Sequence, residues 1–392
     1  MRSAPASASS RMTSSKSTER KELTRMPDNN DWRLELSEYI RQGEPGRAEK
    51  SAAWQTAIGL QAVDGLTTSD YLLATAKEHI EGGIDLPEAK RRIESYYEQR
   101  RDRQAVENGT MEADIVSTRI TELLAEKTFQ FSPAELQSIH RRLFAGVFDH
   151  AGKLRDYNIT KKEWVLNGAT VLYAAYDSIR ETLDYDFSRE KQFSYEKLSA
   201  PEAIRHIAAF TSGVWQIHPF CEGNTRATAV FIVKYLKTFG FTVNNDVFAE
   251  NSWYFRNALV RANYNDLQNG VHATNEFLER FFENLLLDAK HELKNRYLHV
   301  DYERQAKIQS ANGKAPKCQN VTLDCTLDEL ALLRAISANP TVTQKQLAAL
   351  IGKSERTIKR RMEAMQEKGW LHRENGKRSG RWKLSDAAKE VV

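Results

Sequence analysis

Apolar residues recur at helical spacing along most of this chain, and two neighbouring stretches carry the clearest pattern. In residues 201–217 apolar side chains such as Ile207 and Trp215 repeat every three or four positions, which predicts a helix with one buried face. Residues 227–236 are an almost unbroken apolar run and predict a second, buried helix. The polar residues that start at His218 therefore form the turn between two helices and the N-terminus of the second.

A group of short helices is predicted ahead of this region, within residues 50–100. The expected helices cover 54–63, 69–80 and 86–97. Ser69 is a typical N-cap, Gly82 follows the second helix, and Pro87 suits the first turn of the third. Because three short helices bury little apolar surface by themselves, we expect this unit to pack on the domain that follows.

The C-terminal part, residues 326–385, shows a different order of elements. The expected helices are 327–336, 343–352 and 355–368, followed by a basic hairpin over 370–384. Three helices and a hairpin in this order are typical of a winged helix-turn-helix. Residues 301–325 are polar and are interpreted as a linker, and residues 1–30 as a disordered tail. The tail also has the composition of a transit peptide.

Positive charge is concentrated in the C-terminal module. From Thr326 to the end there are 14 Lys and Arg residues against 8 Asp and Glu, a net charge of +6 in a chain whose total is +4. This favours DNA as a partner, although winged helices also serve as protein-docking modules. The candidate DNA contacts are Arg356, Lys359 and Arg360 on the third helix, and Lys377, Arg378 and Arg381 on the hairpin.

Composition limits the remaining classes. The chain has 392 residues, 41% of them hydrophobic and 28% charged. We see no apolar stretch of the ~18–20 residues that a bilayer requires, and no signal-peptide core near the start, so no membrane partner is expected. Three cysteines indicate a reducing compartment, hence a cytoplasmic location. The nine histidines form no cluster with metal-ligand spacing, which argues against a zinc site.

The nine residues HPFCEGNTR, which begin at His218, carry the strongest chemical signal. Glu222 is a hard oxygen ligand suited to Mg²⁺, and Gly223 allows the backbone to approach a ligand oxygen. Asn224 can donate from its amide, and Arg226 can bind phosphate with two parallel hydrogen bonds. The free N–H groups of a helix N-terminus favour anions, and a neutral His218 can accept a proton from an attacking hydroxyl. The alternative is a surface turn that contains an ordinary histidine.

These residues resemble the signature of the Fic family, HxFx(D/E)GNGRxxR. The resemblance implies a mainly α fold, with a Fic-type helical core over residues 112–290 and a small β-hairpin flap. It implies that His218 is the general base for moving AMP from ATP to a protein hydroxyl and that Glu222 binds Mg²⁺. Phosphate binding would fall to Gly223, Asn224, Thr225 and Arg226. Phe220 would anchor the loop in the core.

Two positions depart from that signature. Thr225 stands where the second glycine is usual, so its side chain would crowd the anion pocket or add a hydroxyl contact. Ala229 stands where the second arginine is usual, and a cation that would hold the γ-phosphate is missing there. Neither position touches the base.

The resemblance also assigns roles outside the signature. Residues 156–168 are β-prone and end in Asn167-Gly168, and the family has a hairpin flap at this place that aligns the target's backbone. Lys161 and Trp164 are the expected flap residues for target docking, with core packing as the alternative for Trp164. The helix 252–261 presents Tyr254, Asn257 and Arg261 on related faces. The first two are candidates for contacts with the adenosine, and core packing is the alternative for Tyr254.

The helical unit over residues 50–100 resembles the small antitoxins that silence Fic toxins through an (S/T)xxxE(G/N) helix. Asp64-Gly65 would match the Glu-Gly pair, and Leu60 replaces the Ser or Thr. In that family the inhibitory glutamate pairs with the second arginine of the signature, where this chain has Ala229. Asp64 is therefore either an inhibitory residue or part of a helical packing cap.

The sequence predicts a protein adenylyltransferase with ATP as substrate, Mg²⁺ as cofactor and a hydroxyl of another protein, or of itself, as acceptor. One alternative is a DNA-binding regulator whose Fic domain binds nucleotide without turnover. Another is a Fic enzyme that uses a different nucleotide or removes AMP. The target, the DNA site and the oligomeric state, a homodimer included, stay open.

Overall fold

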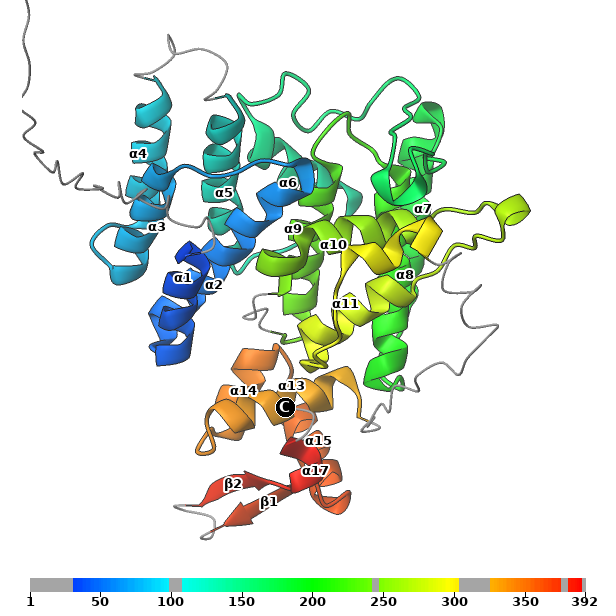
Figure 1. Cartoon of the computed structure of the whole chain (residues 1–392). Helices are drawn as coiled ribbons and strands as arrows, with labels where there is room; N and C mark the ends of the chain where they lie inside the picture. The colour runs from blue at the N-terminus through cyan, green and yellow to red at the C-terminus, as the bar shows by residue number, and fades with distance from the viewer. Residues whose placement is uncertain (1–30, 99–107, 242–246, 303–324, 375–379, 390–392) are drawn as a thin grey trace, which may run out of the picture.

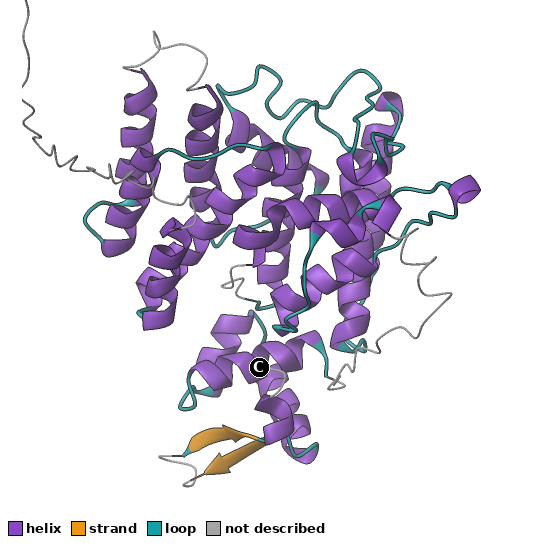
Figure 2. Cartoon of the chain, viewed as in Figure 1, coloured by secondary structure: helices purple, strands orange, loops and turns teal. Residues whose placement is uncertain are grey.

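The computed structural model describes residues 31–98, 108–241, 247–302, 325–374 and 380–389. The predicted tail, nearly all of the predicted linker, and the hairpin residues Lys377 and Arg378 lie outside these ranges. The described chain is mainly helical, with strands only in its C-terminal module, as Figures 1 and 2 show. The mainly α fold class is confirmed. None of the helices in these ranges is both long and apolar enough to cross a bilayer.

The N-terminal helices pack side by side at one edge of the molecule (Figure 1). They are α1 (Asp31–Gln42), α2 (Pro45–Gly59), η1 (Leu60–Asp64), α3 (Asp70–Glu81) and α4 (Leu86–Glu98). The Ser69 hydroxyl caps α3 by accepting from the Leu72 amide, as the sequence predicts. The helix predicted at 54–63 instead tightens to a 3₁₀ turn at Leu60. Gly65 closes that turn with φ of 71°.

Helix α2 joins this unit to the rest of the molecule. It packs on α5 and α10, and Trp54, Ala57 and Leu60 in and beside it are fully buried. Its last residue, Gly59, lies so close to α10 that a Cβ there would come within 2.3 Å of the Ala249 Cα. Gly59 also accepts a hydrogen bond of 2.7 Å from the Ser252 hydroxyl. The unit is therefore docked backbone against backbone.

A buried carboxylate holds the loop that follows η1. Asp114 on α5 accepts hydrogen bonds from the Ser69 amide at 2.9 Å, from the Ser69 hydroxyl, and from the Tyr97 hydroxyl at 2.7 Å. Burial raises the pKa of Asp114 to about 6, against the opposing effect of these hydrogen bonds. The position of η1 is thus fixed at both ends, by α10 and by α5.

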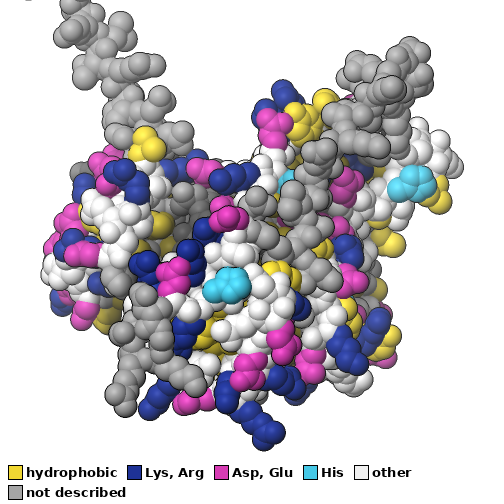
Figure 3. Space-filling model, turned by 90° about the horizontal axis from the view of Figure 1, so that it is seen from below, with side chains coloured by type: hydrophobic (Ala, Val, Ile, Leu, Met, Phe, Trp, Pro, Cys, Tyr) yellow, Lys and Arg dark blue, Asp and Glu magenta, His cyan; other side chains and the backbone are white. Residues whose placement is uncertain are grey.

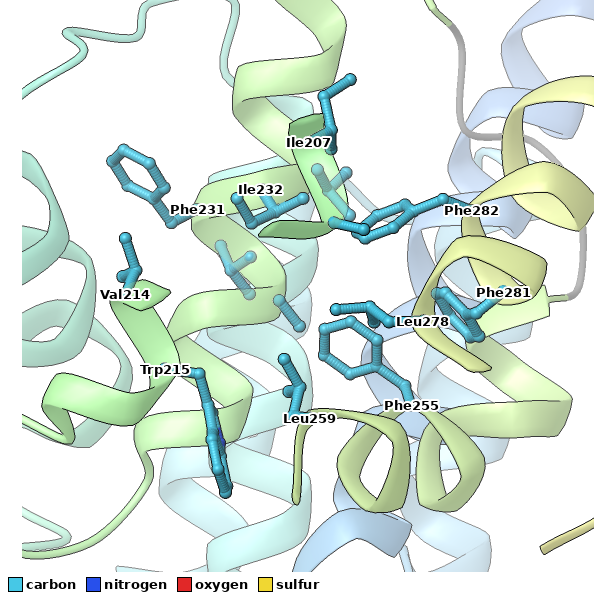
Figure 4. Packing of buried hydrophobic residues seen from close by; sticks show 14 of the residues in the cluster. Ile207, Val214, Trp215, Phe231, Ile232, Phe255, Leu259, Leu278, Phe281 and Phe282 are labelled. Carbon is cyan, nitrogen blue, oxygen red and sulfur yellow. The ribbon is translucent and has the colours of Figure 1, made fainter. Parts of the chain in front are cut away.

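The central domain is a bundle around α9, whose side chains are almost all buried. Its helices are α5 (Asn108–Ala125), α6 (Pro133–Phe144), α7 (Ile179–Gln192), α8 (Ala200–Ile217), α9 (Asn224–Thr238), α10 (Val247–Ala262) and α11 (Glu276–Leu287). Short 3₁₀ turns are η2 (Trp164–Leu166), η3 (Tyr176–Ser178), η4 (Leu267–Asn269) and η5 (Asn295–Leu298). Figure 4 shows side chains from several of these helices in one core, with Phe231 on α9 and with Phe255 of α10 beside Phe281 of α11. Both helices predicted around the motif, α8 and α9, are present.

The C-terminal module is a helix-turn-helix with a two-stranded wing. Its elements are α13 (Leu327–Ala338), α14 (Gln344–Ile351), α15 (Glu355–Glu367), β1 (Leu371–Glu374), β2 (Arg381–Leu384) and α17 (Asp386–Lys389). The strands are antiparallel, with Leu371 opposite Leu384. The module touches the central domain through α13, because Leu327 and Leu330 join the central core and the Cys325 carbonyl accepts from the Ala200 amide at 2.6 Å.

The flap differs from the predicted hairpin. Within the described part of the chain, residues 156–168 form no strand ladder but a loop with the 3₁₀ turn η2, closed where the Glu163 amide donates to the Ala169 carbonyl at 2.9 Å. Asn167 and Gly168 do adopt positive φ, as their Asn-Gly turn signal suggests. Val165 and Leu166 are both buried, and two adjacent inward side chains are incompatible with the alternation of a strand.

Replacing Gly59 with alanine is expected to destabilise the chain by about 1–3 kcal/mol, because its Cβ overlaps the α10 backbone. Gly46 in the same helix has open space around it, so Gly46→Ala is the matched control and should be neutral or slightly stabilising. Urea unfolding of the full chain measures both. Equal midpoints for the two variants would contradict the tight docking of α2.

Candidate active site

His218 ends α8 and is held in an unusual backbone conformation. It is the C-cap of α8 with φ of 50°, a left-handed geometry that non-glycine residues seldom adopt. Its side chain is 3% exposed, packed near the rings of Tyr173 and Trp215 at centroid distances of 4.3 and 5.2 Å. The imidazole predicted as the base is therefore covered, and any substrate hydroxyl requires the covering side chains to move.

The hydrogen bonding of His218 fixes which ring nitrogen can act as a base. Nδ1 lies 3.3 Å from the Trp215 carbonyl oxygen, which can only accept, so Nδ1 carries the proton. Nε2 is buried and has no partner among the described residues. Burial, followed by the nearby positive charge of Lys161, holds the pKa of His218 well below its usual value. The ring is thus neutral near pH 7, with its lone pair on an unsatisfied nitrogen.

Arg155 fixes the main chain around His218. Its side chain is buried and donates to four backbone carbonyls: those of His218 at 2.8 Å, Ile217 at 3.3 Å, Tyr157 at 2.7 Å and Ala174. Its own amide donates to the Pro219 carbonyl at 2.9 Å. One guanidinium therefore joins the end of α8 to both sides of the flap.

The turn after His218 is closed by internal contacts. The Asn224 side chain accepts from the Phe220 amide at 2.9 Å and donates to the Phe220 carbonyl at 2.7 Å, so its amide is used within the loop. Gly223 has φ of 74°, and a Cβ there would lie 2.4 Å from the Phe144 ring. The glycine is thus required both by its conformation and by close packing. Phe220 is buried and anchors the loop as expected.

His140 on α6 also supports this turn through hydrogen bonds of its ring. Its Nδ1 accepts from the Gly152 amide at 2.8 Å, so Nε2 carries the proton and donates to the Glu222 carbonyl at 2.9 Å. Its ring stacks on Phe220 at a centroid distance of 3.7 Å. Burial lowers the pKa of His140 to about 4, which keeps this tautomer neutral. These contacts position the backbone of Glu222 and leave its carboxylate out of the turn.

The two departures from the signature are accommodated inside the bundle. The Thr225 hydroxyl accepts from the Trp215 indole at 3.0 Å, and Ala229 is fully buried. No side chain of the described residues caps the N-terminus of α9, which begins at Asn224. Backbone amides at this end are the groups that a phosphate would approach.

Arg226 is fully engaged by residues that precede the motif. Its Nη1 donates to the Gln61 side chain at 3.0 Å, its Nη2 donates to Glu112 at 2.6 Å, and its Nε lies 2.7 Å from an Asp64 carboxylate oxygen in an ion pair. The side chain is 2% exposed, and its guanidinium covers the Phe144 ring. Asp64 thus pairs with the first arginine of the signature, since the second is absent.

Glu222 points outward and forms an ion pair with a lysine of the flap. Its side chain is 56% exposed, and one carboxylate oxygen lies 3.1 Å from the Lys161 Nζ. The described residues contain no group of three or more metal-ligating side chains, and Glu222 is the carboxylate that the motif supplies. One carboxylate fits Mg²⁺, which usually keeps several waters and shares substrate phosphates. Glu222 therefore fits a metal that arrives with a nucleotide.

The base of the flap is held by a buried ion pair. Glu163 is 1% exposed and binds both terminal nitrogens of Arg256, at 2.7 and 3.1 Å. The Tyr173 hydroxyl lies 3.4 Å from Glu163, and the Tyr173 ring covers His218. Trp164 is 51% exposed and rests edge-on against His299. The flap is thus anchored on α10, with Lys161 over the motif and Trp164 exposed.

The predicted adenosine contacts lie in the interior. Tyr254 belongs to the central core, and the Asn257 side chain donates to Asn295 at 2.7 Å. Arg261 donates to the Leu298 carbonyl at 2.7 Å. Two surface hollows of about 250 and 190 Å³ occur elsewhere, at Tyr71 and Tyr96 and beside Ser132 and Leu183, and neither is lined by the motif.

The candidate DNA contacts are on the surface. Arg356, Lys359 and Arg360 are exposed on α15, whose opposite face buries Ile358 and Met362. Figure 3 views the molecule from the side that carries the winged module and shows Lys and Arg beside Asp and Glu, with no patch of one sign. On the wing, the Arg381 Nε lies 3.3 Å from Glu374, which also pairs with Lys383.

Four residues that support the site were not singled out by sequence reasoning: Arg155, His140, Glu112 and Gln61. The first two lie in a segment whose resemblance to the Fic core is visible, but their partners are backbone atoms, which leave no pattern in the sequence. Glu112 and Gln61 meet Arg226 across 114 and 165 residues. Contacts between residues so far apart in sequence become visible only in the three-dimensional structure.

Residues 130–236 match the Fic/DOC family, and residues 329–371 match the family described as winged helix-turn-helix DNA-binding. Over 179 residues the chain is 25% identical to the protein adenylyltransferase VbhT of Bartonella schoenbuchensis. That alignment covers 45% of this chain and 35% of VbhT, so it spans about a third of the relative.

One similar solved structure is a Fic family protein from Desulfovibrio desulfuricans, with 15% identity and a TM-score of 0.44. That comparison covers 93% of this chain and 97% of the other. The family matches lie over the two modules described above. This chain therefore carries a Fic/DOC domain followed by a winged helix-turn-helix module.

Proposed function

We propose that this chain transfers AMP from ATP to a hydroxyl side chain of a protein. The observation that carries the proposal is the buried, neutral His218, whose Nε2 has a lone pair and no partner among the described residues. The loop that follows His218 leads directly to the N-terminus of α9, which has no side-chain cap. A base and an anion site at this spacing suit a reaction in which a hydroxyl attacks a phosphate.

The chemistry assigns a role to each side chain. The acceptor hydroxyl gives its proton to His218 Nε2 while its oxygen bonds to the α-phosphorus of ATP, and the bond to the leaving pyrophosphate breaks. The amides at the start of α9 bind phosphate oxygens, and Arg155 and the Trp215 carbonyl keep the imidazole oriented. Glu222 would hold Mg²⁺, whose charge would neutralise that of the phosphates.

Replacing His218 with alanine is expected to abolish incorporation of labelled AMP, a loss of at least about 100-fold for removal of a general base. The assay incubates the full chain with labelled ATP and Mg²⁺ and reads intact mass for an added AMP. His272, a histidine outside the motif, provides the control His272→Ala. Undiminished labelling in the His218 variant would refute the assigned base.

Asp64 is proposed as the inhibitory residue, with Glu112 as a second arm. Two carboxylates and an amide occupy all three nitrogens of Arg226, so this guanidinium cannot bind phosphate at the same time. The apparent ATP affinity is then the intrinsic affinity multiplied by the fraction of molecules in which Arg226 is released. The alternative is a packing role, in which the same contacts serve only stability.

Asp64→Ala is expected to raise ATP affinity and AMP transfer, and Asp64→Ala with Glu112→Gln to raise them further, by about tenfold per charged contact with Arg226 removed. Calorimetric ATP titration and labelling measure the two quantities. Asp70, exposed in the same unit, supplies the control Asp70→Ala. ATP affinity that is unchanged in the double variant, together with lowered stability, would favour the packing role.

The winged module is proposed to bind DNA, so that the chain combines nucleotide and DNA binding. The same two modules suit the alternative of a regulator that binds nucleotide without turnover. Such a regulator would show ATP-dependent DNA binding and would transfer no AMP. A product of another mass would indicate another nucleotide or AMP removal.

Removing the charges of Arg356 and Arg360 together is expected to weaken DNA binding at least about tenfold and to lower the salt slope by about 2, one per lost phosphate contact. Fluorescence anisotropy with a labelled duplex at several salt concentrations measures this. Lys197, exposed on the central domain, provides Lys197→Ala as the control. An equal loss of DNA affinity in the α15 variant and in Lys197→Ala would argue against α15 as the DNA contact.

A further inference from the structure

The positively charged side chains near the motif differ in how firmly the fold holds them. Arg155 is committed to backbone carbonyls, Arg256 to the buried Glu163, and Arg226 to two carboxylates and an amide. All three side chains are at most 16% exposed. Their charges are therefore fixed by the fold.

Lys161 is different, because its partner is an exposed carboxylate. Its side chain is 29% exposed and that of Glu222 is 56% exposed, with 3.1 Å between Nζ and the carboxylate oxygen. Ion pairs at such exposure are weak and exchange readily. A lysine is a flexible point charge, able to move over several ångströms about its four-carbon stem.

The position of Lys161 over Glu222 also places an ammonium where a divalent cation would bind. If Glu222 takes a metal with the incoming nucleotide, the lysine loses its partner and lies beside the polyphosphate. Ala229 leaves the site without the arginine that the Fic signature supplies for the γ-phosphate. Lys161 contacts the motif from the flap, through Glu222, and is near enough to His218 to lower its pKa.

We propose that Lys161 is a polyphosphate ligand that exchanges Glu222 for the terminal phosphates of a bound nucleoside triphosphate. The substrate class follows, because a cation at the β- and γ-phosphates favours triphosphates over monophosphates. This rests on the proposed function only in taking ATP as the nucleotide. It gives the flap lysine a role in binding nucleotide, distinct from docking of the target.

The test is calorimetric titration of the full chain carrying Asp64→Ala with ATP and with AMP, each in Mg²⁺. Lys161→Met, which keeps an unbranched side chain of nearly the same length and removes the charge, is expected to weaken ATP binding about tenfold and AMP binding less than about twofold. Lys161→Arg should retain ATP affinity. Lys162→Met, the same charge change at the exposed neighbouring position, should leave both affinities unchanged.

ATP affinity in Lys161→Met within about twofold of the parent would overturn the inference, and so would an equal loss in Lys162→Met or absence of ATP binding by the parent. The proposed function is separated by measuring AMP transfer in parallel. A loss of ATP affinity without AMP transfer in any variant supports the ligand role and refutes the transferase. Reduced transfer at unchanged ATP affinity assigns Lys161 to target docking instead.

Discussion

The buried guanidinium of Arg226 is the point on which both the fold and the site depend. A charge this deep must be compensated, and it is held by Asp64, Gln61 and Glu112 from two separate parts of the chain. Removing either carboxylate weakens the compensation of a buried charge, so the N-terminal unit and the motif stabilise each other. A phosphate is the one ligand in the proposed reaction that could replace those carboxylates. Under the proposed function, the stability of the arrangement in which Arg226 is paired and the affinity for nucleotide are therefore opposed.

The proposed base, His218, is positioned by contacts with the main chain more than with side chains. His218 takes a left-handed conformation at the end of α8, and Arg155 secures the carbonyls on either side of it. The Trp215 carbonyl selects the tautomer, and burial keeps the ring neutral. Such an arrangement costs backbone strain and buried polarity, which proteins tolerate mainly where a ligand or reaction benefits.

Much of the fold could be predicted because it follows local signals. The apolar periodicity of α8 and α9, the Ser69 cap and the order of elements in the winged module are all present in the structure. Contacts between distant segments could not be predicted. The sequence assigned the Asn224 amide to a ligand, yet it closes on Phe220, and it placed strands in the flap, where adjacent buried residues produce a 3₁₀ turn. The partner of Asp64 was also hidden, since it depends on how α2 docks.

Helix α8 is tied down at both ends. Its first amide donates to the Cys325 carbonyl, at the entry to the winged module, and its last turn carries His218. One residue added or lost in an α-helix rotates everything beyond it by about 100° and shifts it by about 1.5 Å. The His218 imidazole would then lose its contact with the Trp215 carbonyl, or the winged module would lose its hydrogen bond to the start of α8. The helix can therefore vary in composition along its solvent face but not in length, which makes its 18 residues a fixed spacer between the winged module and the candidate active site.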